Sequence, residues 1–125
     1  MQEVWMKLAA VTIDCPDPDA LAEFYARATG FERSPDSDPE YIELTGPNGV
    51  SLGFERVADY RPPQWPGQQT PQQCHLDFAV PDLDEGEARL LTLGATKAEV
   101  QPEPDRWRVL IDPAGHPFCL VIDGA

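Results

Sequence analysis

Apolar and polar side chains alternate along two stretches of the chain, residues 8–14 and 74–80. A period of two predicts a β-strand that packs one face against other elements. In the first stretch, the more polar side consists of Ala10, Thr12 and Asp14. In the second stretch, the same side consists of His75, Asp77 and Ala79. The pattern therefore predicts two equivalent strands that carry different chemistry on the same face.

Each predicted strand is followed by a proline–aspartate pair and then by a helical pattern. Asp17 and Asp82 are suited to cap a helix N-terminus, and Gly30 and Gly94 are suited to end a helix in the left-handed conformation. Between these positions, leucine and aromatic residues recur at helical spacing, which predicts an apolar stripe on each helix. The order of strand, stop and helix thus occurs twice in the chain.

Further strands are expected after each helix. In the first half they are a short strand from Phe31 and strands at residues 41–45 and 50–57, the last two joined by a glycine- and asparagine-containing turn. In the second half they lie near residues 96–100, 107–111 and 118–123. We expect one domain, residues 1–125, with a first βαβββ module at about 6–57, a proline- and glutamine-rich connector at 58–73 and a second module at about 74–125.

Two such modules predict an α+β fold with a cupped mixed sheet, helices on its outer face and a concavity inside. The charge limits the partners, because 9 basic and 22 acidic residues give a net charge of −13. Such a surface repels phosphate backbones and anionic lipid, so we expect neither a nucleic-acid nor a membrane partner. The sequence contains no apolar run of about 20 residues and no secretion-signal pattern, and we therefore expect a cytoplasmic protein.

The two βαβββ units resemble the vicinal oxygen chelate superfamily, which includes glyoxalase I, extradiol dioxygenases, fosfomycin-resistance enzymes and bleomycin-binding proteins. The resemblance covers residues 8–123. The segments RPPQWPG, QQCHLDFAVPDLD and DPAGHPFCLV are similar to the small glyoxalase-like proteins of this superfamily. The resemblance implies a homodimer and a binding site for a small molecule in the cup of the sheet.

The resemblance also implies where a metal ion would bind. Members that use a metal hold it with one residue from the first strand and one from the last strand of each module, usually His, Gln or Glu. The matching positions here are Ala10, Gly53, His75 and Cys119. Because alanine and glycine have no ligand atom, we expect no metal and no other cofactor. A nonstandard site for a divalent metal would use His75 and Cys119 with Glu55 or Asp77.

The concave side of the predicted sheet supplies the candidate site residues. The candidate ligand-binding residues are Thr12, Glu55, His75, Asp77, Trp107, Cys119 and Val121. His75 and Asp77 are also the candidate catalytic residues, since a neighbouring carboxylate orients an imidazole and favours its charged form.

Each candidate also has a structural interpretation. His75 can be satisfied by a neighbouring strand, and Cys74 and Cys119 can pack as small apolar side chains in their strands. Trp107 suits a core or an interface as well as a stacking wall. Asp14 and Glu55 suit exposed strand ends, and His116 suits a turn.

The sequence therefore leaves three functional hypotheses open. The first is a protein that binds or sequesters a drug or metabolite without the four-ligand metal site. The alternative is an enzyme, either a metal-dependent lyase or dioxygenase or a metal-free isomerase that uses His75 with Asp77. The third is a protein that acts only through its dimer surface.

Overall fold

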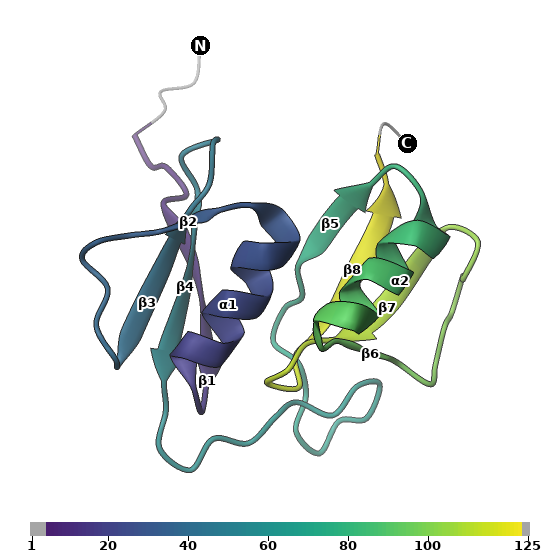
Figure 1. The fold of residues 1–125 in the computed structure, drawn as a ribbon. Helices are drawn as coiled ribbons and strands as arrows, with labels where there is room; N and C mark the ends of the chain where they lie inside the picture. Colours follow the sequence, from purple (N-terminus) through teal and green to yellow (C-terminus); the bar gives the residue numbers. More distant parts are fainter. Residues whose placement is uncertain (1–4, 124–125) are drawn as a thin grey trace. The chain divides into compact units, whose positions relative to one another are not determined.

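A computed structural model of the protein describes residues 5–123. The chain forms two compact units, and the boundary between them follows Tyr60. The first unit contains β1 (Ala10–Cys15), α1 (Pro18–Thr29), β2 (Glu32–Arg33), β3 (Tyr41–Thr45) and β4 (Ser51–Arg56). The second contains β5 (Asp77–Val80), α2 (Leu83–Leu93), β6 (Thr96–Lys97), β7 (Trp107–Ile111) and β8 (Pro117–Ile122). In each unit the helix covers one face of a four-stranded sheet (Figure 1). The predicted α+β class with two βαβββ modules is confirmed.

Both sheets have the same topology. The strand order is β1-β4-β3-β2 in the first unit and β5-β8-β7-β6 in the second. The first strand of each module pairs in parallel with the last strand, and the remaining pairs are antiparallel. Residues at the start and at the end of one module are therefore direct neighbours in its sheet.

The helix ends lie where the sequence predicts them. The side chain of Asp17 accepts a hydrogen bond from the backbone N–H of Ala20 at 3.3 Å, and Asp82 accepts one from Glu85 at 2.9 Å. Gly30 and Gly94 end the helices with φ values of 78° and 119°. This left-handed region is one that glycine enters without steric cost.

Each helix packs its apolar stripe onto its own sheet. In the first unit, Tyr25 of α1 stacks on Phe54 of β4 with ring centroids 5.5 Å apart. In the second unit, α2 approaches the sheet closely at Gly86, where an added Cβ would lie 3.2 Å from side-chain carbons of Val80 and Leu120. The helix-facing side of each sheet is therefore the core of its unit.

Arg108 fixes the orientation of β7 under α2. Its guanidinium forms ion pairs with Asp84 at 2.9 Å and with Glu87 at 3.1 Å, both on α2, and its side chain is only 13% exposed. Because successive side chains of a strand point to opposite faces, Trp107 and Val109 must face away from α2. The ion pairs thus help to determine which side chains lie on the helix-free face.

Two predicted strands are each three residues shorter than expected. The strand predicted at 74–80 begins at Asp77, although the Leu76 carbonyl still accepts a hydrogen bond from the Cys119 N–H at 2.9 Å. The strand predicted at 96–100 is limited to Thr96–Lys97. Beyond it, the Ala98 N–H still donates to the Val109 carbonyl at 3.1 Å, and the Gln101 side chain then bonds the backbone of Val109 in place of a further strand residue.

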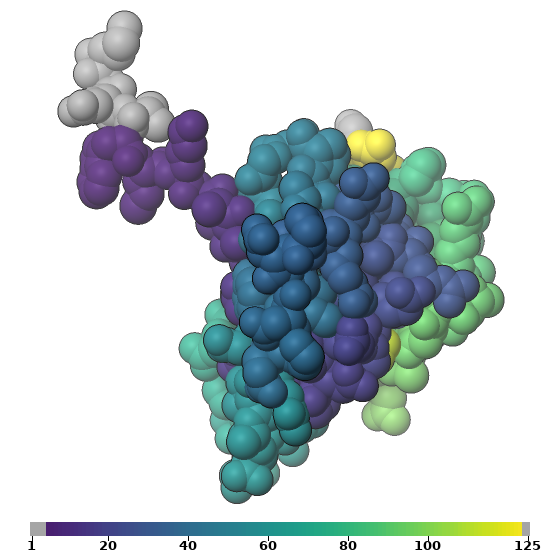
Figure 2. All heavy atoms as spheres, turned by 60° about the vertical axis from the view of Figure 1, so that its left-hand side comes forward, coloured from purple at the N-terminus to yellow at the C-terminus, as the bar shows by residue number. Residues whose placement is uncertain are grey.

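The segment that precedes β1 has no regular secondary structure and carries exposed apolar side chains. Trp5, Met6 and Leu8 expose 81%, 75% and 68% of their surface. Figure 2 shows these purple residues projecting from the rest of the first unit. None of the helices within residues 5–123 is long and apolar enough to cross a membrane.

Candidate functional site

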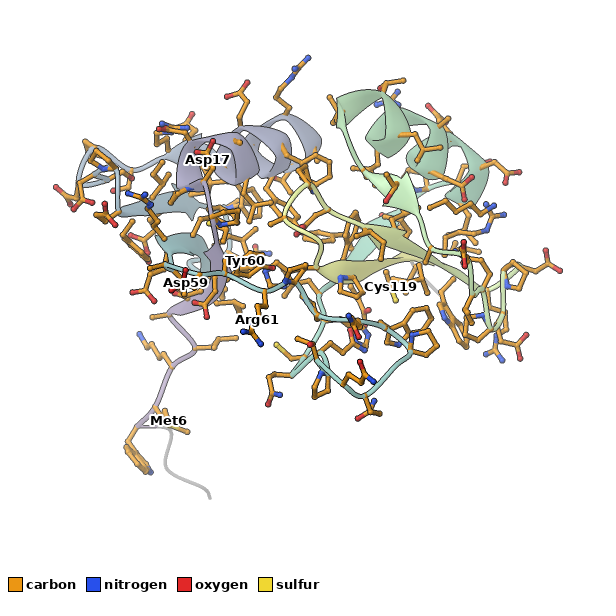
Figure 3. All side chains as sticks on the ribbon, turned by 90° about the horizontal axis from the view of Figure 1, so that it is seen from below. Met6, Asp17, Asp59, Tyr60, Arg61 and Cys119 are labelled. Carbon is orange, nitrogen blue, oxygen red and sulfur yellow. The ribbon has the colours of Figure 1, made fainter. Side chains whose placement is uncertain are left out.

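The helix-free face of the second sheet brings together five of the predicted site residues. Asp77 of β5 pairs with Cys119 of β8, and Val121 of β8 pairs with Trp107 of β7. Directly paired residues in neighbouring strands point to the same face of a sheet. Figure 3 shows the Cys119 side chain on the side of the sheet away from α2. His75 lies two residues before Asp77 and joins it on this face.

His75 and Asp77 form an ion pair when the imidazole is protonated. His75 Nε2 lies 3.2 Å from Asp77 Oδ1, and the two side chains are 42% and 54% exposed. The carboxylate orients the imidazole ring and leaves its other nitrogen available to a bound molecule. The contact between the two side chains therefore orders both of them, while both remain accessible to solvent.

Cys119 is the third member of this polar cluster. Burial of the thiol raises its pKa to about 11, helped by the charge of Asp77 and by a hydrogen bond with it. The thiol is thus protonated at neutral pH and donates to the same carboxylate that contacts His75. The potential ligand atoms of His75, Asp77 and Cys119 all lie within 4.8 Å of one another. We call these three residues the Asp77 cluster.

An apolar wall borders the Asp77 cluster. Val109 is buried and pairs with Cys119, while Trp107 and Val121 form the next row of the same face and are half-buried. A few polar groups beside an apolar and aromatic wall are typical of sites that bind small organic molecules. The second unit therefore presents both elements of such a site on one face.

The first module has different chemistry at the equivalent positions. Thr12 pairs with Gly53, and the Tyr41 ring lies over this glycine. A Cβ at Gly53 would lie 2.8 Å from a carbon of that ring and 2.9 Å from Thr12 Oγ1. Contacts of this length are too close for real side chains, so any other residue at position 53 would force Tyr41 and Thr12 to shift. Glu55 is exposed and pairs with Asp14 and Tyr41.

The four-ligand metal site of the superfamily does not fit this chain. Ala10 and Gly53 supply no donor atom, and the Tyr41 ring and Thr12 fill the space beside Gly53. Thr12 and Glu55 lie in the first unit, whereas the Asp77 cluster lies in the second. Only His75 and Cys119 of the four positions carry side chains that can bind a metal ion.

His116 and Cys74 do not belong to the Asp77 cluster. His116 follows the β7–β8 turn, and its backbone N–H donates a hydrogen bond to the buried carboxylate of Asp112 at 3.0 Å. The expectation that Cys74 packs in an apolar strand is wrong, because β5 begins three residues later and Cys74 is exposed.

Sequence reasoning missed Tyr41 as a residue of the helix-free face. The available signal was Gly53, which stands in the middle of the otherwise apolar segment Leu52 to Phe54. A glycine inside a strand often marks a place where another group approaches closely. Here that group is the tyrosine ring.

Comparison with known proteins identifies relatives of the whole fold. Residues 10–121 match the family model described as glyoxalase-like domain. A comparison with curated proteins gives no significant match.

Solved structures with the same fold include a glyoxalase/bleomycin resistance protein/dioxygenase family enzyme from Burkholderia phytofirmans PsJN. It is 20% identical, with a TM-score of 0.70 over 92% of this chain and 97% of that chain. A glyoxalase-related enzyme from Fulvimarina pelagi is 21% identical, with a TM-score of 0.68 over 95% of this chain and 89% of that one. The trypanothione-dependent glyoxalase I of Leishmania major is 18% identical, with a TM-score of 0.63 over 95% and 88%. At these identities the likeness shows the fold alone.

Proposed function

Since this chain belongs to the glyoxalase-like domain family of the vicinal oxygen chelate superfamily, we propose that it binds a small organic molecule on the helix-free face of its second module. The observation that carries the proposal is the contact of His75 with Asp77, 3.2 Å apart, beside the wall of Trp107 and Val121. The proposed role is binding or sequestration of a drug or metabolite.

The composition of the face indicates the kind of ligand. The apolar wall favours a molecule with an aromatic or aliphatic body, because burying apolar surface contributes about 25 cal/mol per Å². The His75 imidazole, held by Asp77, favours a polar group on that body that accepts or donates one hydrogen bond. The binding does not use the four-ligand metal site of the superfamily, since Ala10 and Gly53 have no donor atoms.

A thermal-shift screen with aromatic antibiotics and hydrophobic metabolites tests the proposal. A ligand that binds the folded state raises the melting temperature by mass action, and calorimetry then gives its Kd. We expect His75→Ala and Asp77→Asn to weaken binding of that ligand roughly 10-fold or more, the usual cost of a lost charge-assisted hydrogen bond.

Glu85→Gln is the matched control, because it also changes a carboxylate to an amide but lies on α2, which packs on the other face of the same sheet. It should leave the Kd unchanged. A ligand whose affinity is the same in all three variants would contradict a site at His75 and Asp77.

The His75–Asp77 pair also supports a second candidate function, a metal-free isomerase. A histidine held by a carboxylate is the usual arrangement of a general base, which abstracts a proton from a bound molecule and returns it. In that case a ligand found in the screen would be converted, and NMR of the ligand would show a product. His75→Ala should then abolish turnover, whereas a ligand that remains unchanged through long incubation favours the binding protein.

A further inference from the structure

We propose that His75, Asp77 and Cys119 form a three-ligand site for a zinc-type divalent metal ion, contained entirely within the second module. The absence of a metal was expected from the four positions that the superfamily uses. Asp77 is not one of these positions, and the structure places its carboxylate against both His75 and Cys119. The chain thus offers one nitrogen, one oxygen and one sulfur donor at a single point.

The spacing of the donor atoms suits one ion. The ligand atoms lie within 4.8 Å of one another. A tetrahedral zinc ion binds such atoms at about 2.0–2.3 Å, which places them roughly 3.3–3.8 Å apart. Closing the remaining gap requires a shift of less than about 1.5 Å by this estimate. His75 and Asp77 are substantially exposed, so rotation of their side chains can supply it.

The three donors also select the kind of ion. Imidazole, carboxylate and thiolate are the three ligand types of zinc sites, whereas calcium and magnesium prefer sites made of oxygen. The Cys119 thiol would release its proton to solvent as the metal–sulfur bond forms, and Asp77, which accepts that proton in a hydrogen bond without metal, would be free to bind the ion. Three protein ligands leave a fourth position for water or another molecule, as in open zinc sites.

The site would differ from the superfamily arrangement in two respects. It takes all of its ligands from one module, because Ala10 and Gly53 of the first module have no donor atoms. It also includes a thiolate, which favours softer ions such as Zn²⁺ and Co²⁺. The inference does not rest on the organic ligand proposed above, since the three donors are in place without it.

Titration of the reduced, chelator-treated full chain with Co²⁺ tests the inference directly. Cobalt bound to a thiolate gives a charge-transfer band in the near ultraviolet, and tetrahedral cobalt gives visible bands. We expect both to saturate at one Co²⁺ per chain and to disappear when Zn²⁺ is added. Cys119→Ser should abolish the charge-transfer band, and His75→Ala and Asp77→Asn should each weaken Co²⁺ binding at least 10-fold.

Cys74→Ser is the matched control, because this exposed thiol is adjacent to His75 in the chain but is not part of the Asp77 cluster. It should leave the spectrum unchanged. Zn²⁺ should also raise the melting temperature of the wild type but not of Cys119→Ser, and circular dichroism establishes that each variant is folded. Absence of a thiolate band in the wild type, or a band that survives Cys119→Ser, would overturn the inference. Neither result bears on the small-molecule screen, which needs no metal.

Discussion

At the scale of single residues, Asp77 determines the chemistry of the second module because it contacts both of its polar neighbours. It pairs with His75 at 3.2 Å and accepts a hydrogen bond from the Cys119 thiol. The equivalent position of the first module is Thr12, which lies beside Gly53 and Tyr41. Three differences between the repeats thus create the cluster: Asp77 stands in place of Thr12, and its partners His75 and Cys119 stand in place of Ala10 and Gly53.

The reactivity of Cys119 should follow from this contact. A thiol with a pKa of about 11 is almost entirely protonated at pH 8, and only the thiolate reacts with alkylating reagents. We therefore expect iodoacetamide to modify Cys74 at least 10-fold faster than Cys119, as measured by mass spectrometry of the digested protein.

Asp77→Asn removes the negative charge that disfavours the thiolate, so the pKa of Cys119 should fall and its alkylation at pH 8 should become faster. Glu85→Gln should leave the rate unchanged. A slower reaction of Cys119 in Asp77→Asn would contradict the proposed influence of the carboxylate.

The members of the Asp77 cluster could be predicted from the period-two pattern, because His75 and Asp77 are on one side of a strand and Cys119 has the same parity in another. Their contact depends on the register of β5 against β8, which the pattern does not contain. Tyr41 was missed because the ring reaches over Gly53 from a residue that also suits ordinary strand packing.

At the scale of elements, the Gln101 side chain supplies hydrogen bonds to β7 that a longer β6 would otherwise make. Its amide donates to the carbonyls of Ala98 at 3.0 Å and Val109 at 2.7 Å, and its oxygen accepts from the Val109 N–H at 2.9 Å. These bonds satisfy the backbone of β7 where β6 has already ended. Helix ends could be predicted from Asp17 and Asp82, since a cap acts locally, but a side chain that completes a sheet has no local signature.

Gln101→Ala should lower the free energy of unfolding by roughly 1–3 kcal/mol, because it removes the acceptor of the buried Val109 N–H, whereas the Val109 carbonyl keeps its bond from the Ala98 N–H. Urea denaturation followed by far-ultraviolet circular dichroism measures the change. Gln68→Ala, which alters an exposed glutamine of the connector, should change it by less than about 0.5 kcal/mol. Equal effects of the two substitutions would refute the role of Gln101.

At the scale of the whole molecule, the same βαβββ topology carries two different helix-free faces. The repeat and its capping residues were sufficient to predict the fold class, because it depends on element order, and the superfamily followed from the resemblance of the repeat and of three short segments. The function of each face depends on single side chains within that order. A fold shared with glyoxalases therefore limits where a site lies without assigning its chemistry.

We also propose that the chain forms a homodimer through the apolar segment before β1, where Trp5, Met6 and Leu8 are exposed. Large apolar side chains that are exposed close together in the sequence are suited to contacts with another protein. Analytical ultracentrifugation should give twice the chain mass for the wild type and the monomer mass when all three residues are changed to serine. A dimer that persists in the triple variant would exclude this segment as its interface.

The pairing of β5 with β8 has a consequence for the order in which the protein is made. These strands are the first and the last of the second module, so the Asp77 cluster joins residues from the two ends of that module. During synthesis, His75 and Asp77 leave the ribosome well before Cys119, because α2, β6 and β7 lie between them in the chain. The cluster is thus completed only after β8 has been made, and an incomplete chain that lacks β8 would be unable to hold a ligand there.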